Sequence, residues 1–394
     1  MNFMNNLKLI FIGLLLLLSC KIHSQRNDSI QFSLLTCEPG TEIYSLFGHT
    51  AIRYQNFTRN TDIVFNYGMF SFSTPNFIYR FVKGETDYQL GINRFNSFEA
   101  EYALRGSSVH QQVLNLTTDE KLRLQDLLFT NYQPENRVYR YNYFYDNCTT
   151  RARDQIEKCI DGTVEYPEAE PGKTFRSIVH EFTRGFGWEE FGIDLCLGAE
   201  ADSEIGIRQQ MFSPFYMHDF ASKAYIVSSD GSKRPLVLKE ELIVDAAKTE
   251  AEPGFPLSPM ACSLIFLLLN VIIGFLQYSK RKIYWGWDIV LYMSQGIAGC
   301  IIAFLFFVST HPTVGSNWLL ILFNPIPLLY LPFMLYRTIT RKKDPYYVIN
   351  TAYLTFFIAL IPFIPQEINL SVLPLALGLL VNSASHFLVI KNRT

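Results

Sequence analysis

The chain has 394 residues, of which 49% are hydrophobic and 18% charged, and its formal net charge is −2 at pH 7. This average hides two unlike parts, because residues 1–258 carry 25 Lys/Arg and 33 Asp/Glu, whereas residues 259–394 carry 9 and 3. The first part is acidic and rich in aromatic residues, and the second is too apolar to remain in water. Together they exclude a single soluble enzyme, a basic nucleic-acid-binding protein and a disordered chain.

The first 24 residues have the pattern of a signal peptide. Lys8 precedes an apolar run over residues 9–18, and small or polar residues follow at 19–24. We expect cleavage before Gln25, while cleavage before Cys20 and retention of the segment as an anchor are the alternatives. The domain that follows is therefore expected in the periplasm.

Residues 25–245 mix strand and helix patterns, which predicts an α+β domain. Short runs rich in β-branched and aromatic residues predict strands at 50–54, 63–67 and 109–116. Three helices are expected: one with its N-cap at Thr117 or Thr118, one from Asn147 to Ile160, and one at 174–186. A polar stretch, 246–258, is expected to link this domain to the rest of the chain.

Residues 259–394 are expected to form an all-α bundle of five transmembrane helices. Their apolar segments have the length needed to span a bilayer and cover 259–278, 289–308, 319–336, 348–364 and 370–390. All nine basic residues of this part fall in alternate loops, which are cytoplasmic by the positive-inside rule. The sequence thus predicts a multi-pass protein of the inner membrane, with residues 25–245 in the periplasm and the C-terminus in the cytoplasm.

Seven cysteines occur, and none has the spacing of a zinc site. The chain contains no Cys-x-x-Cys and no His-x-x-x-His, so we expect neither a metal nor a cofactor. The periplasm permits disulfides. If one forms, Cys159 with Cys196 is the natural pair, because Cys148 has another use.

Cys148 lies in the first turn of a predicted helix, directly after the capping Asn147. Unpaired backbone N–H groups and the helix dipole stabilise a thiolate at such a place. A thiolate nucleophile needs a base, and the best candidate is His49, which begins a predicted strand after Gly48. The residues alone leave open whether the two side chains meet, and each is also compatible with a structural role.

The surroundings of these residues resemble a known family. A His on a strand followed by an Asn-Cys at a helix start is similar to the permuted papain-like (NlpC-like) fold, which includes lecithin retinol acyltransferase-type enzymes. The whole chain resembles the Lnb family of lipoprotein N-acyltransferases more closely, through Phe47-Gly-His-Thr-Ala-Ile-Arg, Asp62-Ile-Val-Phe-Asn-Tyr-Gly, the stretch 139–151 that contains Asp-Asn-Cys-Thr-Thr-Arg, and Thr310-His-Pro-Thr with Asn317.

The resemblance implies that Cys148 is the nucleophile and His49 the base, and it leaves the third member open between Asn66 and Asp62. It implies that an acyl chain passes from a phospholipid through a Cys148 thioester to the α-amino group of a diacylated lipoprotein. The expected partners are thus these two substrates and the bilayer, with no nucleic acid. Residues expected to contact substrate are Arg53, Asn147, Tyr141, His311 and Asn317.

Two other classes of function remain open. A Cys-His domain of this kind can hydrolyse cell-wall peptides with water as the acceptor, which would make the protein a membrane-anchored amidase or peptidase. Five spans argue against this class, because a soluble substrate needs a tether but not a polytopic anchor. The third class, a non-catalytic membrane scaffold, leaves the Cys148 and His49 pattern unexplained.

Overall fold

The computed structural model describes residues 29–247, 254–340, 342 and 344–391. The predicted signal peptide, 1–24, lies outside these residues. The chain divides into two compact units. We call one the sheet unit, which takes its residues from Met1–Ser71, Asp87–Glu170 and Gly206–Glu250. The other, the span unit, takes Phe72–Thr86, Pro171–Ile205 and Ala251–Thr394.

The sheet unit is built on a seven-stranded sheet with the order β10-β5-β1-β2-β3-β4-β6, in which every pair of neighbours is antiparallel. The strands are β1 (Ile30–Cys37), β2 (His49–Asn56), β3 (Thr61–Met69), β4 (Asp87–Arg94), β5 (Val109–Leu114), β6 (Val138–Arg140) and β10 (Val237–Val244). A second sheet joins β7 (Thr163–Glu165), β8 (Tyr225–Val227) and β9 (Lys233–Pro235). The predicted strands at 50–54 and 63–67 fall within β2 and β3.

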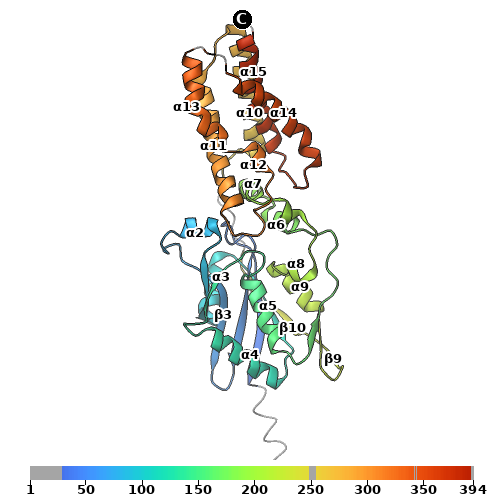
Figure 1. Ribbon diagram of the computed structural model, residues 1–394. Helices are drawn as coiled ribbons and strands as arrows, with labels where there is room; N and C mark the ends of the chain where they lie inside the picture. The colour runs from blue at the N-terminus through green and yellow to red at the C-terminus, as the bar shows by residue number, and fades with distance from the viewer. Residues whose placement is uncertain (1–28, 248–253, 341, 343, 392–394) are drawn as a thin grey trace, which may run out of the picture. The chain divides into compact units, whose positions relative to one another are not determined.

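Helices pack on both faces of the large sheet. They are α3 (Phe95–Arg105), α4 (Thr118–Asn131), α5 (Cys148–Cys159) and α9 (Pro214–Lys223), and the short α8 (Ile207–Gln210) precedes α9 in the chain. Successive residues of a strand point to opposite faces. Accordingly, the Thr50 hydroxyl contacts Thr149 of α5, whereas Ala51 lies in a buried core with Phe98 of α3. The strands β2 and β3 are therefore enclosed between α5 and α3 (Figure 1).

Local capping explains where α4 and α5 begin. Thr117 caps α4 in a reciprocal box, because its hydroxyl accepts from the Glu120 N–H and the Glu120 carboxylate accepts from the Thr117 N–H. Asn147 caps α5 in the same reciprocal way with Thr150. Both predicted helix starts are thus confirmed.

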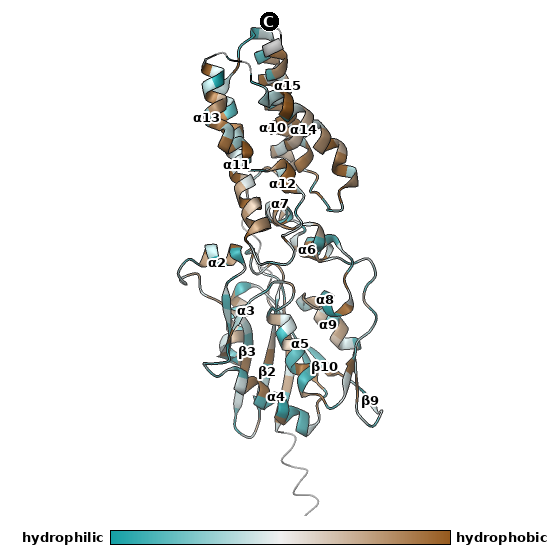
Figure 2. Ribbon diagram, in the orientation of Figure 1, coloured by the Kyte–Doolittle hydropathy of each residue, from teal (hydrophilic) through white to brown (hydrophobic). Residues whose placement is uncertain are grey.

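Five segments of the span unit are long and apolar enough to cross a membrane, and they run over Pro259–Lys280, Trp285–Phe307, Leu319–Ile339, Tyr346–Phe363 and Val372–Val389. The helices that form them are α10 (Pro259–Lys280), α11 (Trp285–Phe307), α12 (Leu319–Leu322), α13 (Ile326–Ile339), α14 (Tyr346–Leu360) with η2 (Ile361–Phe363), and α15 (Val372–Lys391). Figure 2 shows apolar residues along all of these helices. The predicted α+β domain followed by five membrane helices is confirmed.

The third span is broken between α12 and α13, where Asn324 and Pro325 interrupt the helix. The side-chain amide of Gln295 on α11 donates to the Leu322 carbonyl at 2.8 Å. Gly299 permits close approach, because a Cβ there would lie 2.3 Å from the Asn324 backbone. A polar donor and a small residue of α11 therefore stabilise the break within the bundle.

Two stretches that precede the spans in sequence belong to the span unit. One contains α2 (Phe77–Lys83), and the other contains α6 (Phe175–Thr183), α7 (Gly187–Cys196) and the 3-10 turn η1 (Ala199–Asp202). Loops between the spans bind the second stretch directly. The Gly198 N–H donates to the Thr313 carbonyl at 2.8 Å, and the Gln366 amide donates to the Leu197 carbonyl at 3.0 Å.

Candidate active site

Cys148 is the first residue of α5, and Asn147 fixes its position. The Asn147 side-chain oxygen accepts from the N–H groups of Thr149 and Thr150, both at 2.9 Å. Its amide nitrogen donates to the carbonyls of Tyr143 and Phe212, at 2.8 and 2.9 Å. These four hydrogen bonds use the full capacity of a side-chain amide, which leaves none for the substrate contact expected of Asn147.

The same cap decides which backbone donors remain beside the sulfur. The N–H groups of Thr149 and Thr150 bind the cap, and the Arg151 N–H donates to the Asn147 carbonyl at 3.1 Å. Among the residues that the structure describes, no acceptor binds the N–H of Cys148. The first turn of α5 thus offers a single donor next to the thiol, rather than the several expected of an uncapped helix start.

His49 and Cys148 interact directly. Burial raises the pKa of the Cys148 thiol, but the charge of His49, its hydrogen bond to the sulfur and a backbone hydrogen bond from Thr50 outweigh burial and lower the pKa overall. Burial lowers the pKa of His49, while the Cys148 charge and hydrogen bonds to Cys148 and Asn66 outweigh it and raise the pKa overall. The two opposite shifts favour a thiolate–imidazolium pair.

Asn66 completes this arrangement from the neighbouring strand. The Nε2 atom of His49 lies 3.2 Å from Oδ1 of Asn66, and Nδ2 of Asn66 donates to Oδ1 of Asn93 at 3.1 Å. Because the Asn93 contact leaves Oδ1 of Asn66 as the acceptor, His49 carries its hydrogen on Nε2. The Nδ1 atom is then the one that exchanges a proton with the thiol.

Asp62, the other candidate for the third position, has a different partner. Its carboxylate binds Arg53 through two hydrogen bonds, at 2.9 and 2.6 Å. Arg53 also donates to Gln111 at 2.8 Å, and its guanidinium carbon lies 3.3 Å from the centre of the Phe95 ring. Arg53 is only 8% exposed, whereas the Asp62 side chain is 34% exposed, so the ion pair lies at the edge of the interior. Of the two candidates, the structure brings Asn66 to His49.

Gly68 and a stack of aromatic rings border the thiol. A Cβ at Gly68 would lie 3.5 Å from the Cβ of Cys148 and 3.9 Å from the Tyr141 ring. Tyr141 stacks on Tyr88 with 4.1 Å between ring centres, and Tyr88 stacks on Phe70 at 4.9 Å. Tyr141 thus lies near Cys148, and its predicted substrate contact stays a prediction. Gly68, whose φ is +85°, keeps the space beside the sulfur open.

Tyr143 is a residue of the site that the sequence pattern did not single out. Its ring packs edge-on against Phe47, with 5.2 Å between centres. Its hydroxyl is buried and binds no acceptor among the described residues. Burial and the Cys148 charge raise the pKa of Tyr143 well above the usual value, so this hydroxyl stays protonated as a donor. The only available signal was its place in the aromatic run just before Cys148.

The two arginines that follow Cys148 in α5 are each paired with a carboxylate. Arg151 pairs with Asp146 at 2.6 Å and lies 3.6 Å over the Tyr139 ring. Arg153 pairs with Asp154 at 2.8 Å. Neither arginine is among the main causes of the lowered thiol pKa, of which the charge of His49 is the largest.

His311 and Asn317 lie in the span unit, where both bind the protein itself. His311 Nε2 is 2.8 Å from the Phe81 carbonyl. Asn317 is buried, donates to the Leu195 carbonyl at 2.8 Å and accepts from the Gln366 amide at 3.2 Å. These contacts give the two residues structural partners, and the predicted substrate contacts stay predictions.

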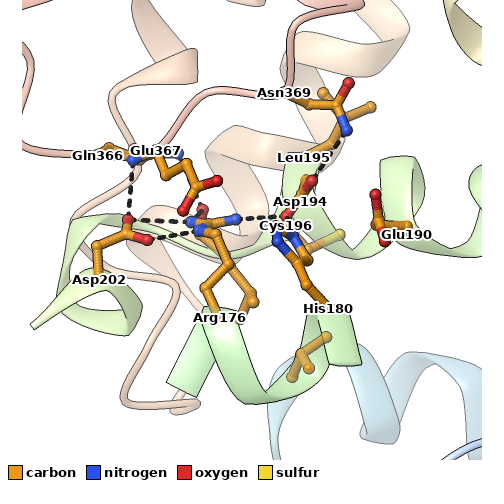
Figure 3. Close-up of polar contacts among 12 residues, drawn as sticks. Arg176, His180, Glu190, Asp194, Leu195, Cys196, Asp202, Gln366, Glu367 and Asn369 are labelled. Carbon is orange, nitrogen blue, oxygen red and sulfur yellow. Dashed lines mark hydrogen bonds and ion pairs between the residues drawn. The ribbon is translucent and has the colours of Figure 1, made fainter. Parts of the chain in front are cut away.

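A second polar cluster in the span unit has ligand types suited to a metal (Figure 3). Ligand atoms of His180, Glu190 and Asp194 all lie within 4.8 Å of one another. The Asp194 carboxylate, however, already accepts from Arg176 at 2.7 Å, from His180 at 2.9 Å and from Asn369 at 2.9 Å. The fully buried Arg176 cation would repel a metal ion there. The cluster is better described as a buried ion pair that joins α6, α7 and the loop before α15.

All six described cysteines are free. The pairing of Cys159 with Cys196 is therefore absent. Cys159 is fully buried, and its sulfur donates to the Ile156 carbonyl at 3.0 Å.

Comparison with known families matches both parts of the chain. Residues 22–181 match the model of the Lnb N-terminal periplasmic domain, and residues 250–394 match that of the Lnb transmembrane domain. No curated protein and no solved structure matches the chain.

Proposed function

Because the chain belongs to the Lnb family, we propose that it is a lipoprotein N-acyltransferase whose nucleophile is Cys148. The observation that carries the proposal is the contact of the helix-capped thiol with His49, which in turn binds Asn66. A thiol of lowered pKa, a base that holds a proton and an amide that orients the base are the parts needed for acyl transfer through a thioester.

In the first half of the reaction, the Cys148 thiolate attacks an ester carbonyl of a phospholipid. The tetrahedral intermediate carries an oxyanion, to which we assign the Cys148 N–H and the Tyr143 hydroxyl as donors, since neither binds an acceptor among the described residues. The intermediate collapses as the ester C–O bond breaks, and His49 gives its proton to the leaving lysophospholipid oxygen. The acyl chain then remains on Cys148 as a thioester, and His49 is neutral.

In the second half, the α-amino group of a diacylglyceryl-cysteine attacks this thioester. Such an amine has an ordinary pKa of about 7.7 to 8.0, so part of it is neutral near pH 7. His49 takes the proton that the amine loses as the amide bond forms, and the C–S bond breaks to release the thiolate. The imidazolium and thiolate are restored, and the lipoprotein carries a third acyl chain.

The membrane spans give this chemistry a reason to be in the bilayer, because both substrates are lipids. Contacts within the span unit support the predicted orientation. The residue that precedes α10 by two positions, Leu257, accepts a hydrogen bond from Trp188 of α7 at 2.8 Å, and the residues after α11 bind the α2 segment of the periplasmic domain. With five spans, an N-terminal periplasmic domain then requires a cytoplasmic C-terminus.

Mass spectrometry of lipoprotein N-termini tests the proposed function. In a strain with no other N-acyltransferase, the Cys148→Ser variant should yield lipoproteins with two chains and a free α-amino group. Cys159→Ser, which changes another cysteine of α5 away from the site, should retain three chains. Three-chain lipoproteins in the Cys148→Ser strain would overturn the proposal. If that strain instead showed altered cell-wall peptides, the protein would be an amidase.

A further inference from the structure

Several apolar side chains of helix α2 and of the loop before it are exposed. It lies in the chain between β3, which carries Asn66, and β4, which carries Tyr88. No residue of α2 is buried. Ile78 is 76% exposed, Tyr79 55%, and Phe72 in the preceding loop 65%. A short helix with so much exposed apolar surface gains little stability from its own packing, so another medium must cover this surface.

Contacts within the span unit fix α2 at one end of a membrane span. The Tyr79 ring lies 5.9 Å from that of Phe304, in the last turn of α11. Beyond α11, the His311 imidazole is 2.8 Å from the Phe81 carbonyl. The Thr310 N–H donates to the Lys83 carbonyl at 2.9 Å. These contacts join helix α2 to the point where α11 leaves the hydrocarbon.

The local backbone favours this attachment. Gly84 ends α2 in a left-handed conformation, with φ +78°. A Cβ at Gly84 would lie 2.6 Å from the Thr310 hydroxyl oxygen, so only glycine permits the two segments to approach this closely. The arrangement of α2 against the span end is thus specified by the sequence.

The composition of α2 suits a membrane surface. The helix combines three aromatic residues with the basic Arg80 and Lys83 in its last turn, and Lys83 also pairs with Glu85 at 2.8 Å. Aromatic rings prefer the headgroup level, and basic side chains bind anionic lipid headgroups. The site of attachment at a span end and the exposed apolar side chains both point to lipid, not to another protein.

We propose that α2 and Phe72 form an interfacial anchor that inserts into the periplasmic leaflet and binds phospholipid acyl chains there. The phospholipid surface is continuous with the hydrocarbon that surrounds α11. The anchor is independent of the acyl-transfer chemistry. If the proposed function holds, the anchor would bind donor lipid at the segment that connects β3, which carries Asn66, with β4, which carries Tyr88.

Photo-crosslinking of the full-length protein in vesicles of phosphatidylethanolamine and phosphatidylglycerol tests the anchor. A benzophenone amino acid at position 78 should form covalent adducts with phospholipid on illumination, as it should at Phe333, an exposed residue of the third span. Phe57, which is 60% exposed at the β2–β3 turn of the sheet unit, is the control for labelling of an exposed aromatic residue outside the span unit. Lipid adducts at 333 but not at 78 would overturn the proposal.

A kinetic experiment separates the anchor from the chemistry. Ile78→Glu should raise the apparent KM for vesicle-bound phospholipid by about tenfold, because one large apolar side chain no longer enters the bilayer. Alkylation of Cys148 by iodoacetamide should be unchanged. An unchanged KM would refute the anchor and leave the proposed function standing. If the wild-type protein did not acylate lipoproteins, the proposed function would be refuted, but the crosslinking result would still support the anchor.

Discussion

His49 has two neighbours with different roles. Asn66 accepts from Nε2, which leaves Nδ1 toward the thiol. The pKa of Cys148 is lowered and that of His49 is raised, and both shifts favour the state in which the two groups are charged over a range of pH. Below that range the thiolate is protonated, and above it His49 loses the proton that it must give to the leaving group. We therefore expect a bell-shaped dependence of thioester formation on pH.

Removal of the Asn66 side chain should narrow this range. Asn66→Ala deletes a hydrogen bond that raises the His49 pKa, so the imidazolium is less stable and the thiolate loses part of its counter-charge. The midpoint of the pH curve for alkylation of Cys148 should rise, by up to about one pH unit. Asn93→Ala, which removes only the contact behind Asn66, should shift it less. An unchanged midpoint in Asn66→Ala would contradict the role of Asn66.

The hydroxyl of Tyr143 gives a second prediction at this scale. Tyr143→Phe should lower kcat for thioester formation by about 10²-fold, the usual cost of a lost oxyanion donor. The rate of Cys148 alkylation should stay close to wild type, because that reaction forms no oxyanion. Tyr145→Phe alters a neighbouring, more exposed tyrosine and serves as the control. Equal loss of acylation and alkylation in Tyr143→Phe would instead indicate a structural defect.

At the scale of elements, the start of α5 is the feature on which the site depends. The capping Asn147 hydrogen-bonds the first turn of the helix and also the carbonyls of Tyr143 and Phe212, so it fixes the helix start, and with it the thiol, to two other segments. The structural and functional demands on this residue are therefore linked. A change that frays the turn also moves the sulfur away from His49.

Matched cap variants test this dependence. Asn147→Ala and Thr117→Ala each remove an N-cap and should each lower the free energy of unfolding by about 0.5 to 2 kcal/mol, visible as a lower melting temperature. Only Asn147→Ala should also slow alkylation of Cys148, because Thr117 caps α4, away from the thiol. Slower alkylation in both variants would mean that general destabilisation, not the cap of α5, controls the thiol.

The starts of α4 and α5 could be predicted from sequence because a cap is a local pattern of a few residues. Sheet order could not, since it depends on pairings between distant segments, such as β5 with β10. The partner of His49 could not be predicted either, because it also depends on contacts between distant segments. Asp62 and Asn66 lie on the same face of β3, so periodicity does not distinguish them. The choice depends on Arg53, which takes the carboxylate and leaves the amide to His49.

At the scale of the whole molecule, the two charge regimes of the sequence correspond to two chemical tasks. The acidic part contains the thiol site, and the apolar part supplies five spans, with its basic residues at the span ends and in the loops. Composition predicted this division, but it did not predict that residues 72–86 and 171–205 belong to the span unit. These two stretches are held by contacts of individual residues, such as the hydrogen bonds of Asp194 and His311. Neither the composition nor the hydrophobic periodicity of the sequence predicts contacts of this kind.

The most direct test of the proposed chemistry is the intact mass of the full-length protein after incubation with phospholipid vesicles and no acceptor. We expect an increase by one acyl chain, located on Cys148, that is removed by neutral hydroxylamine and lost on addition of a diacylglyceryl-cysteine peptide, which gains the chain. The Cys148→Ala variant should show no adduct. An active wild-type protein that transfers the chain to the peptide without any acyl adduct on Cys148 would contradict the thioester mechanism.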